Sequence, residues 1–218
     1  MVDIIIPVYN ALDTLELAVT SALMQDDVRI LLVDDGSTDR TADIGEQYAR
    51  RDPRIRVMRL PHGGVSAARN RGLELAESRY VAFMDCDDRV DHQYLAAFFR
   101  TPLPDGDLLV SQGVAIEYIA QNRTELYDYP DTTGTQGELG KIIVENRLLR
   151  DGWTYCKLFS LPLIRREALR FDTGLSICED LVFVLGYLSH VRQIILRSGT
   201  YYHYQVCPDG TSLSQRRQ

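Results

Sequence analysis

Long hydrophobic runs are absent from this sequence of 218 residues. No apolar stretch approaches the roughly 20 residues that a membrane-spanning helix needs. The N-terminal residues 1–7 also lack the basic region that precedes the apolar part of a secretory signal peptide. These two absences predict a cytoplasmic protein without a membrane span.

Cysteine and positive charge are also scarce. The spacing of the four cysteines is not that of metal ligands; they are Cys86, Cys156, Cys178 and Cys207. In a chain of this size we interpret them as reduced thiols rather than as a disulfide framework. The formal net charge is −7, whereas a nucleic-acid-binding surface needs a basic footprint. We therefore expect no disulfide scaffold and no nucleic-acid partner.

What the sequence does contain is an alternation of strand and helix patterns in its first half. Apolar runs predict strands at 2–8, 28–33, 55–60 and from residue 80, and helical spacing predicts helices at 12–24, 41–50 and 66–77. This alternation implies right-handed crossovers and a parallel sheet. With 45% hydrophobic residues, the chain can bury the core of one large α/β domain.

The pattern is looser after residue 88. It predicts short helices at 91–100 and from Pro162, a surface loop at 127–137, helices at 138–150 and 181–188, and strands at 108–119, 156–161, 191–196 and 200–204. We expect a mostly parallel central sheet flanked by helices, with a smaller and less regular region built from the second half of the chain.

Three carboxylates follow the predicted strand that begins at Tyr80. Asp85, Asp87 and Asp88 lie just past its end, where open α/β sheets bind their ligands. Carboxylates crowded in this way repel one another unless a cation or hydrogen-bond donors compensate. The simplest compensating ion is Mg²⁺ or Mn²⁺, which binds one or two carboxylates together with substrate phosphates. The alternative is a polar loop whose aspartates cap the next helix.

Two further acidic pairs stand at the ends of apolar elements. Asp34 and Asp35 precede the turn at 36–38, which could offer backbone N–H groups to a ligand, cap the following helix through the hydroxyl of Ser37 or Thr38, or do both. Glu179 and Asp180 open the last helix, where neighbours do not share a face, so that only one should point into a pocket and the other should orient it or face solvent; the pair could also simply favour the helix dipole. Three acidic sites suggest a metal-assisted reaction with a separate general base.

Five motifs occur in order along the chain. They are Ile4-Ile-Ile-Pro7-Val-Tyr9-Asn10, Val33-Asp34-Asp35-Gly36-Ser37-Thr38-Asp39, Gly64-Val-Ser-Ala-Ala-Arg69-Asn70-Arg-Gly72, Asp85-Cys-Asp87-Asp88 and Glu179-Asp180. Together they resemble the motif series of glycosyltransferase family 2, the inverting transferases with the GT-A fold. The resemblance is close over about residues 2–95 and looser over 153–190. It implies a Rossmann-like GT-A domain with a nucleotide-sugar-binding half at 1–100 and an acceptor-binding half, carrying the catalytic base, at 101–218.

The resemblance implies roles on the nucleotide side. Pro7 and Tyr9 would line the base pocket, and the Asp35 carboxylate, beside the turn at Gly36, would accept a hydrogen bond from uracil. Arg69 would lie near the nucleotide or its phosphates, unless it faces solvent.

It also implies the chemistry. Asp85 would contact the ribose or sugar side, and Asp87, with Asp85, would bind the Mn²⁺ or Mg²⁺ that bridges the diphosphate. Asp180, with Glu179 as the alternative, would deprotonate an acceptor hydroxyl as it attacks C1 of the sugar. The implied activity is transfer from a nucleotide-sugar, first of all a UDP-sugar, to a saccharide, lipid-linked or protein acceptor in cell-surface polysaccharide or glycoconjugate synthesis. Contact with a lipid-linked acceptor would be peripheral, at the inner face of the cell membrane.

Some positions depart from the family pattern or stay open. Cys178 stands where the family most often has glycine, which would narrow the acceptor pocket. Gln205 stands where relatives often have a basic residue that helps the diphosphate; His203 could replace that residue or be structural. Trp153 and Tyr155 could stack on a sugar face or belong to the core.

Three other functions are weighed against this one. A haloacid-dehalogenase-type phosphatase would have Thr or Val where Arg89 stands. A sugar-nucleotide pyrophosphorylase would have a glycine-rich, lysine-bearing first loop instead of residues 7–10. A catalytically silent GT-A-like binding or scaffold subunit is disfavoured by the acids at 35, 87 and 180, but the sequence does not exclude it.

Overall fold

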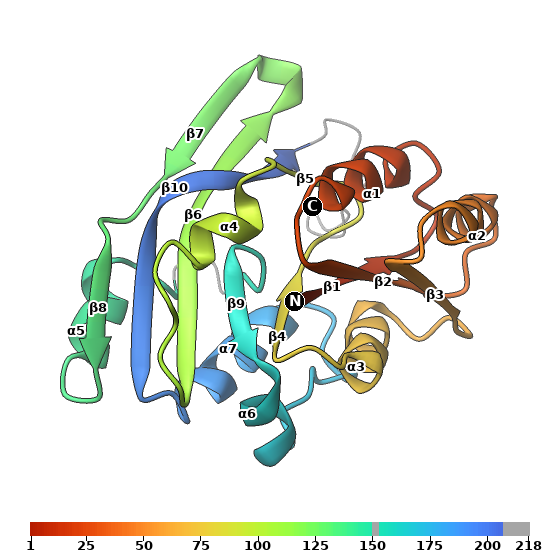
Figure 1. The fold of residues 1–218 in the computed structure, drawn as a ribbon. Coiled ribbons are helices and arrows are strands. Elements are labelled where there is room, and N and C mark those ends of the chain that lie inside the picture. Colours follow the sequence, from red (N-terminus) through yellow and green to blue (C-terminus); the bar gives the residue numbers. More distant parts are fainter. Residues whose placement is uncertain (150–152, 207–218) are drawn as a thin grey trace.

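The computed structural model of the chain describes residues 1–149 and 153–206 (Figure 1). Its strands are β1 (Val2–Val8), β2 (Val28–Asp34), β3 (Ile55–Arg59), β4 (Tyr80–Phe83), β5 (Arg89–Val90), β6 (Leu108–Tyr118), β7 (Arg123–Tyr127), β8 (Thr132–Thr135), β9 (Lys157–Ser160) and β10 (Gln193–Val206). Its helices are α1 (Leu15–Leu23), α2 (Thr41–Arg51), α3 (Val65–Leu75), α4 (Tyr94–Phe98), α5 (Leu139–Glu145), α6 (Leu161–Arg166) and α7 (Glu179–Leu188), with a 3-10 turn η1 (Ile119–Gln121). None of these helices is both long and apolar enough to span a membrane.

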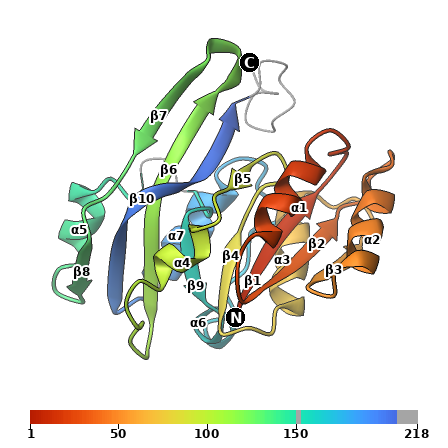
Figure 2. The same cartoon turned by 45° about the horizontal axis from the view of Figure 1, so that its top comes forward.

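The strands form one sheet in the order β3-β2-β1-β4-β9-β6-β10-β5, with β7 added to β6 and β8 to β10. β1 to β4 are parallel, β9 is antiparallel to both β4 and β6, and β10 is parallel to β6. The carboxyl ends of β1, β2, β4 and β10 therefore lie at one edge of the sheet, together with the beginning of β9. Figure 2 shows β1 to β3 on one side of β4 and β6, β7 and β10 on the other. The prediction of a mostly parallel α/β sheet is confirmed.

Both faces of the sheet are covered, which explains the continuous apolar runs of the central strands. In β1, Ile4 and Ile6 face a core shared with α1 and α4, whereas Ile5 faces a core shared with α3, α6 and α7. Side chains of a strand alternate between faces, so a strand with helices on both sides can be apolar at consecutive positions, as β1 is from Ile4 to Val8. All seven residues of β1 are buried.

The second half differs from the prediction at its short strands. The segment 127–137 is not only a surface loop, because β8 lies within it and pairs antiparallel with β10. The predicted strands at 191–196 and 200–204 are one strand with a register shift between Arg197 and Tyr202, where Gly199 has a φ of 113°. Position 150 of the predicted helix, and Cys207, lie outside the described residues.

Candidate functional site

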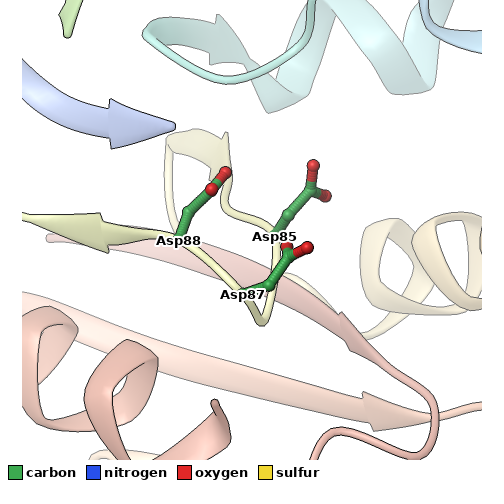
Figure 3. Close-up of side chains that lie close together, drawn as sticks. All are labelled: Asp85, Asp87 and Asp88. Atoms are coloured by element: carbon green, nitrogen blue, oxygen red, sulfur yellow. The ribbon is translucent and has the colours of Figure 1, made fainter. Parts of the chain in front are cut away.

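The loop after β4 carries the acidic cluster of the site. Asp85, Asp87 and Asp88 each contribute a carboxylate oxygen, and these atoms all lie within 4.8 Å of one another (Figure 3). β4 is parallel to β1, and the loop continues the pairing because the amide of Met84 donates to the carbonyl of Ile5 at 3.1 Å. The cluster thus lies at the carboxyl edge of the sheet, as the sequence predicted.

Asp88 is the buried member of the cluster, and the last strand holds both of its oxygens. The Tyr202 hydroxyl donates to Oδ2 at 2.6 Å and the Gln205 amide donates to Oδ1 at 2.9 Å. The Tyr202 oxygen in turn accepts the amide of Asp85 at 3.1 Å. Burial, followed by the charges of Asp85 and Asp87, raises the pKa of Asp88 well above its ordinary value. Sequence reasoning missed this role, because Asp88 and Tyr202 are 114 residues apart.

Asp85 and Asp87 are the members open to a ligand, since both side chains are partly exposed. Burial, and then the neighbouring Asp85 carboxylate, raise the pKa of Asp87 to about 6. This rise reflects negative charge that a cation would compensate. Two carboxylates with free oxygens form the hard donor set that Mg²⁺ and Mn²⁺ prefer. The residues present therefore fit a divalent ion, with Asp85 and Asp87 as its ligands.

Arg69 on α3 connects the acidic loop to α7. Nη2 lies 3.0 Å from Asp85 Oδ1, and Nη1 lies 2.5 Å from Asp180 Oδ1 and 3.2 Å from Glu179 Oε1. The guanidinium carbon also lies 5.4 Å from the centroid of the Phe171 ring. Only 3% of Arg69 is exposed, so the solvent-facing alternative is wrong.

Glu179 and Asp180 begin α7, and both reach the same guanidinium nitrogen. The alternative in which the second acid faces solvent is therefore wrong, and which of the two is the base stays a prediction. The chain enters the helix through Cys178 in the left-handed region, with a φ of 63°.

The pKa of Asp180 is raised to about 7, mainly by burial. The charges of Asp85 and Glu179 raise this pKa further, while Arg69 and Lys157 lower it. A carboxyl that titrates near neutral pH can take a proton during a reaction and return it to water. Asp180 thus has the property that a general base needs.

On the other side of the acidic loop, Asp35 organises a turn. Its oxygens accept the amides of Gly63 and Gly64, each at 2.8 Å, and Oδ2 lies 2.8 Å from Nδ1 of His62. At Gly36 the φ is 77°, and a Cβ there would lie 2.8 Å from the backbone nitrogen of His62. The glycine is therefore required for the close approach of the two segments.

Tyr9 and His62 form an aromatic pair at this end of the site. Their ring centroids are 4.4 Å apart, with 25° between the planes, and Tyr9 is 40% exposed. Pro7 is buried in β1, opposite Val33 of β2. The sequence indicated Pro7 and Tyr9 but not His62, which has no ligand spacing and joins Tyr9 only through the fold.

The turn at 36–38 forms hydrogen bonds with Asn10, just after β1, and does not cap α2 with a side chain. The Ser37 hydroxyl accepts the amide of Asn10 at 3.0 Å, and the amide of Thr38 donates to the Asn10 side chain at 2.9 Å. At the start of α2 the amide of Thr41 donates to Asp39 instead. The capping alternative for the two hydroxyls is thus wrong.

His203 has a structural role. Its Nδ1 lies 2.8 Å from Glu117 Oε1, and its Nε2 lies 3.1 Å from Asp91 Oδ2. Nδ1 also lies 2.9 Å from the Arg89 guanidinium. Both ring nitrogens thus face side chains that tie β10 to β5 and β6, which supports the structural alternative over a phosphate or metal contact.

Comparison with known proteins identifies similar chains. The family model "Glycosyl transferase family 2" matches residues 3–170. The "Uncharacterized glycosyltransferase EpsJ" of Bacillus subtilis (strain 168) is 31% identical over 219 residues, which cover 96% of this chain and 62% of the relative. The "Minor teichoic acid biosynthesis protein GgaB" of the same organism is 31% identical over 225 residues, 98% of this chain and 24% of the relative.

Among solved structures, S. aureus TarS 1-349 in complex with UDP-GlcNAc superimposes with a TM-score of 0.79 at 23% identity, covering 98% of this chain and 60% of the TarS 1-349 chain. The chain therefore spans less than two thirds of the length of each of these proteins.

Proposed function

The chain belongs to glycosyl transferase family 2, and from this premise we propose that it transfers a sugar from a UDP-sugar to an acceptor hydroxyl, with inversion at C1. One observation carries the proposal. The Arg69 guanidinium joins Asp85, in the metal-competent loop, to Asp180, a carboxyl with a pKa of about 7. A metal-binding carboxylate and a general base beside each other are the two groups that such a displacement requires.

The donor site is proposed at the carboxyl ends of β1 and β2. Tyr9 is exposed there, and Asp35 is held by two backbone amides. A carboxylate accepts about four hydrogen bonds, so Asp35 keeps capacity for a uracil N–H. TarS, which has this fold, was solved with UDP-GlcNAc, and this favours uridine as the nucleotide.

The proposed chemistry divides between the two groups that Arg69 joins. Asp85 and Asp87 would hold Mn²⁺ or Mg²⁺, which supplies Lewis-acid compensation of the charge that grows on the departing diphosphate. Asp180 takes the proton of the acceptor hydroxyl while the acceptor oxygen forms its bond to C1. The bond from C1 to the diphosphate oxygen breaks on the opposite face, and UDP leaves. Glu179, on the same guanidinium nitrogen, is the alternative base.

For the acceptor we propose a cell-surface polysaccharide or its lipid-linked precursor, reached at the cytoplasmic face of the membrane. The name of the relative GgaB, which refers to teichoic acid biosynthesis, supports this class.

Calorimetric titration of UDP with Mn²⁺, and again with EDTA, tests the donor and the metal together. We expect micromolar binding that requires the ion and is lost in Asp87→Ala. Asp105→Ala is the matched control, because its carboxylate is 92% exposed and lies away from the cluster. Equal UDP affinity of Asp87→Ala in saturating Mn²⁺ would refute the metal assignment, and absence of binding to UDP, GDP and TDP would favour a silent scaffold.

The base is tested by Asp180→Asn. This variant should bind UDP like the wild type but lose turnover, here measured as UDP release from a UDP-sugar. Wild-type rates in Asp180→Asn, with loss of rate in Glu179→Gln, would move the role to Glu179.

A further inference from the structure

A stack of aromatic rings leads away from the acidic loop on the side opposite the nucleotide. Tyr155 is stacked on Tyr202 with centroids 4.7 Å apart and 9° between the planes. Trp153 is stacked on Tyr155 at 5.0 Å and 21°, and Tyr204 lies beside both rings. The Tyr202 end of the stack contacts the site directly, because the Tyr202 hydroxyl donates a hydrogen bond to Asp88.

The order of strands decides which substrate this stack faces. β4 separates β1 and β2, which carry Tyr9 and Asp35, from β9 and β10. Trp153 precedes β9, and β9 is antiparallel to β4, so Trp153 comes to the same edge of the sheet as the Asp85 loop. The ring therefore lies beyond the acidic loop as seen from the nucleotide side, where an acceptor would approach.

The stack is buried at its Tyr202 end and partly exposed to solvent at its Trp153 end. Tyr202 is fully buried and Tyr155 is 4% exposed, so the core alternative for Tyr155 is the correct one. Trp153 is only half-buried. The underlying rings hold the indole in one orientation, so that little further freedom is lost when a ligand packs on it.

We propose that Trp153 forms an acceptor subsite that binds a pyranose ring by stacking. This inference rests on the proposed transferase function and names the acceptor class, a saccharide with an intact sugar ring rather than an acyclic polyol phosphate. The face of an aromatic ring is negative and its π-system attracts polarised C–H groups, which the face of a pyranose presents. Two ring spacings separate Trp153 from Tyr202, so the stacked sugar would lie at the end of the stack that is far from the acidic loop, on the acceptor side.

The composition of the chain provides a direct probe, because Trp153 is its single tryptophan. With UDP and Mn²⁺ bound, intrinsic fluorescence is followed during titration with methyl pyranosides of glucose, galactose and N-acetylglucosamine in both anomeric forms. D-ribitol 5-phosphate serves as the acyclic probe. We expect a saturable change with at least one pyranoside and none with ribitol phosphate.

Kinetics with the responding pyranoside separate a subsite from a structural role. Trp153→Ala should raise the acceptor KM about tenfold and leave UDP affinity and acceptor-free hydrolysis of the donor unchanged. Trp153→Phe, which keeps an aromatic face, should restore most of the affinity. Phe99→Ala is the matched control: Phe99 is a 38% exposed aromatic residue beside Tyr80, which begins β4 at the opposite edge of the sheet.

Three results would overturn the inference: no fluorescence response to any pyranoside, an equal response to ribitol phosphate, or a full response to UDP alone, which would assign the ring to the donor. Calorimetry with UDP is independent of these results. If UDP does not bind, the proposed function fails, while titration of the pyranosides without UDP still decides whether Trp153 binds sugar rings.

Discussion

Replacement of Arg69 by methionine tests the electrostatic centre of the site. The wild-type guanidinium is 3% exposed and contacts three carboxylates, those of Asp85, Glu179 and Asp180. Methionine retains much of the apolar volume but removes the charge. The variant thus leaves three partly buried carboxylates without their shared cation.

The loss of stability should be large and should depend on pH. Breaking a buried ion pair by removing one partner costs about 3–5 kcal/mol. The folded-state pKa of Asp180 is already raised to about 7, so ionising this group opposes folding as pH rises from its unfolded value of about 3.9. Because Arg69 lowers this pKa, its removal raises it further, by an amount worth about 1.4 kcal/mol per pKa unit. The part of the loss of stability that comes from Asp180 should therefore be absent at acid pH, where this carboxyl is protonated in both folded proteins, and should grow as the pH rises through about 7.

Urea unfolding of wild type and Arg69→Met between pH 4.5 and 8.5 measures this difference. Arg29→Met is the matched control, because Arg29 pairs with the fully buried Asp3 at 2.7 Å. Asp3 also accepts the amides of Glu77 and Ser78, and its pKa is lowered. Because the pKa of Asp3 is lower in the folded state than in the unfolded state, its carboxylate contributes stability at every pH above the unfolded-state pKa. This contribution is lost only when the pH falls through the folded-state pKa. The loss of stability in Arg29→Met should therefore be the same from pH 5 to 8.5.

The same variant makes a kinetic prediction. The acid limb of the kcat/KM profile reports the general base of the free enzyme, and in Arg69→Met it should move to higher pH. A deficit in stability that is the same at every pH would refute the electrostatic argument. An unchanged acid limb with weaker UDP binding would instead show that Arg69 acts on the nucleotide, as the family resemblance implied.

Two further outcomes follow from the same site. Mn²⁺ at 100 times its Kd should stabilise the fold by about 2.7 kcal/mol. The rise in Tm should be larger at pH 7.5 than at pH 5, because Asp87, with a pKa of about 6, must lose its proton to bind the ion. An equal rise at both pH values, or an equal rise in Asp87→Ala, would contradict this. Cys178→Gly should stabilise the chain by roughly 1 kcal/mol, since a left-handed φ of 63° strains any residue with a Cβ. Cys178→Ala, which keeps the Cβ, should bring no gain. Urea unfolding that gives both variants the same stability would refute the argument that the backbone is strained at this position.

The fold of the first half was predictable because its signals are local. The strands β1, β2 and β4 contain runs of consecutive apolar residues, β3 contains three apolar residues, and the helices between them have an apolar stripe, so the predicted boundaries differ from the observed ones by at most three residues. The missed strands are of another kind. β5 has two residues and β8 has four, with the sequence Thr-Thr-Gly-Thr. These two segments become strands only through pairing with β10, as β7, which was also missed, does through pairing with β6, and the sequence does not reveal either pairing.

The residue types of the site were predictable, but their mutual contacts were not. Asp85 and Asp180 each stand at the end of a recognisable apolar element, so each could be proposed from its own neighbourhood. Arg69 joins them across 16 and 111 residues. Its burial follows from Gly72, where a Cβ would lie 2.3 Å from Ile5, so that α3 packs closely on β1. Residues three apart share a helix face, and the face that Gly72 brings to the sheet is also the face of Arg69.

Cys178 shows how a departure from a motif acquires a physical meaning only in the structure. At the sequence level the side chain attracted attention, because cysteine is larger than the glycine that the family most often has. In the fold the side chain is exposed and the backbone is the unusual part, with a φ of 63° just before α7. That conformation precedes the two acids of α7, whose side chains both reach Arg69. A glycine at this position would adopt the same φ without strain, which agrees with the glycine that the family resemblance implies there, and the cysteine adopts it at a cost in stability.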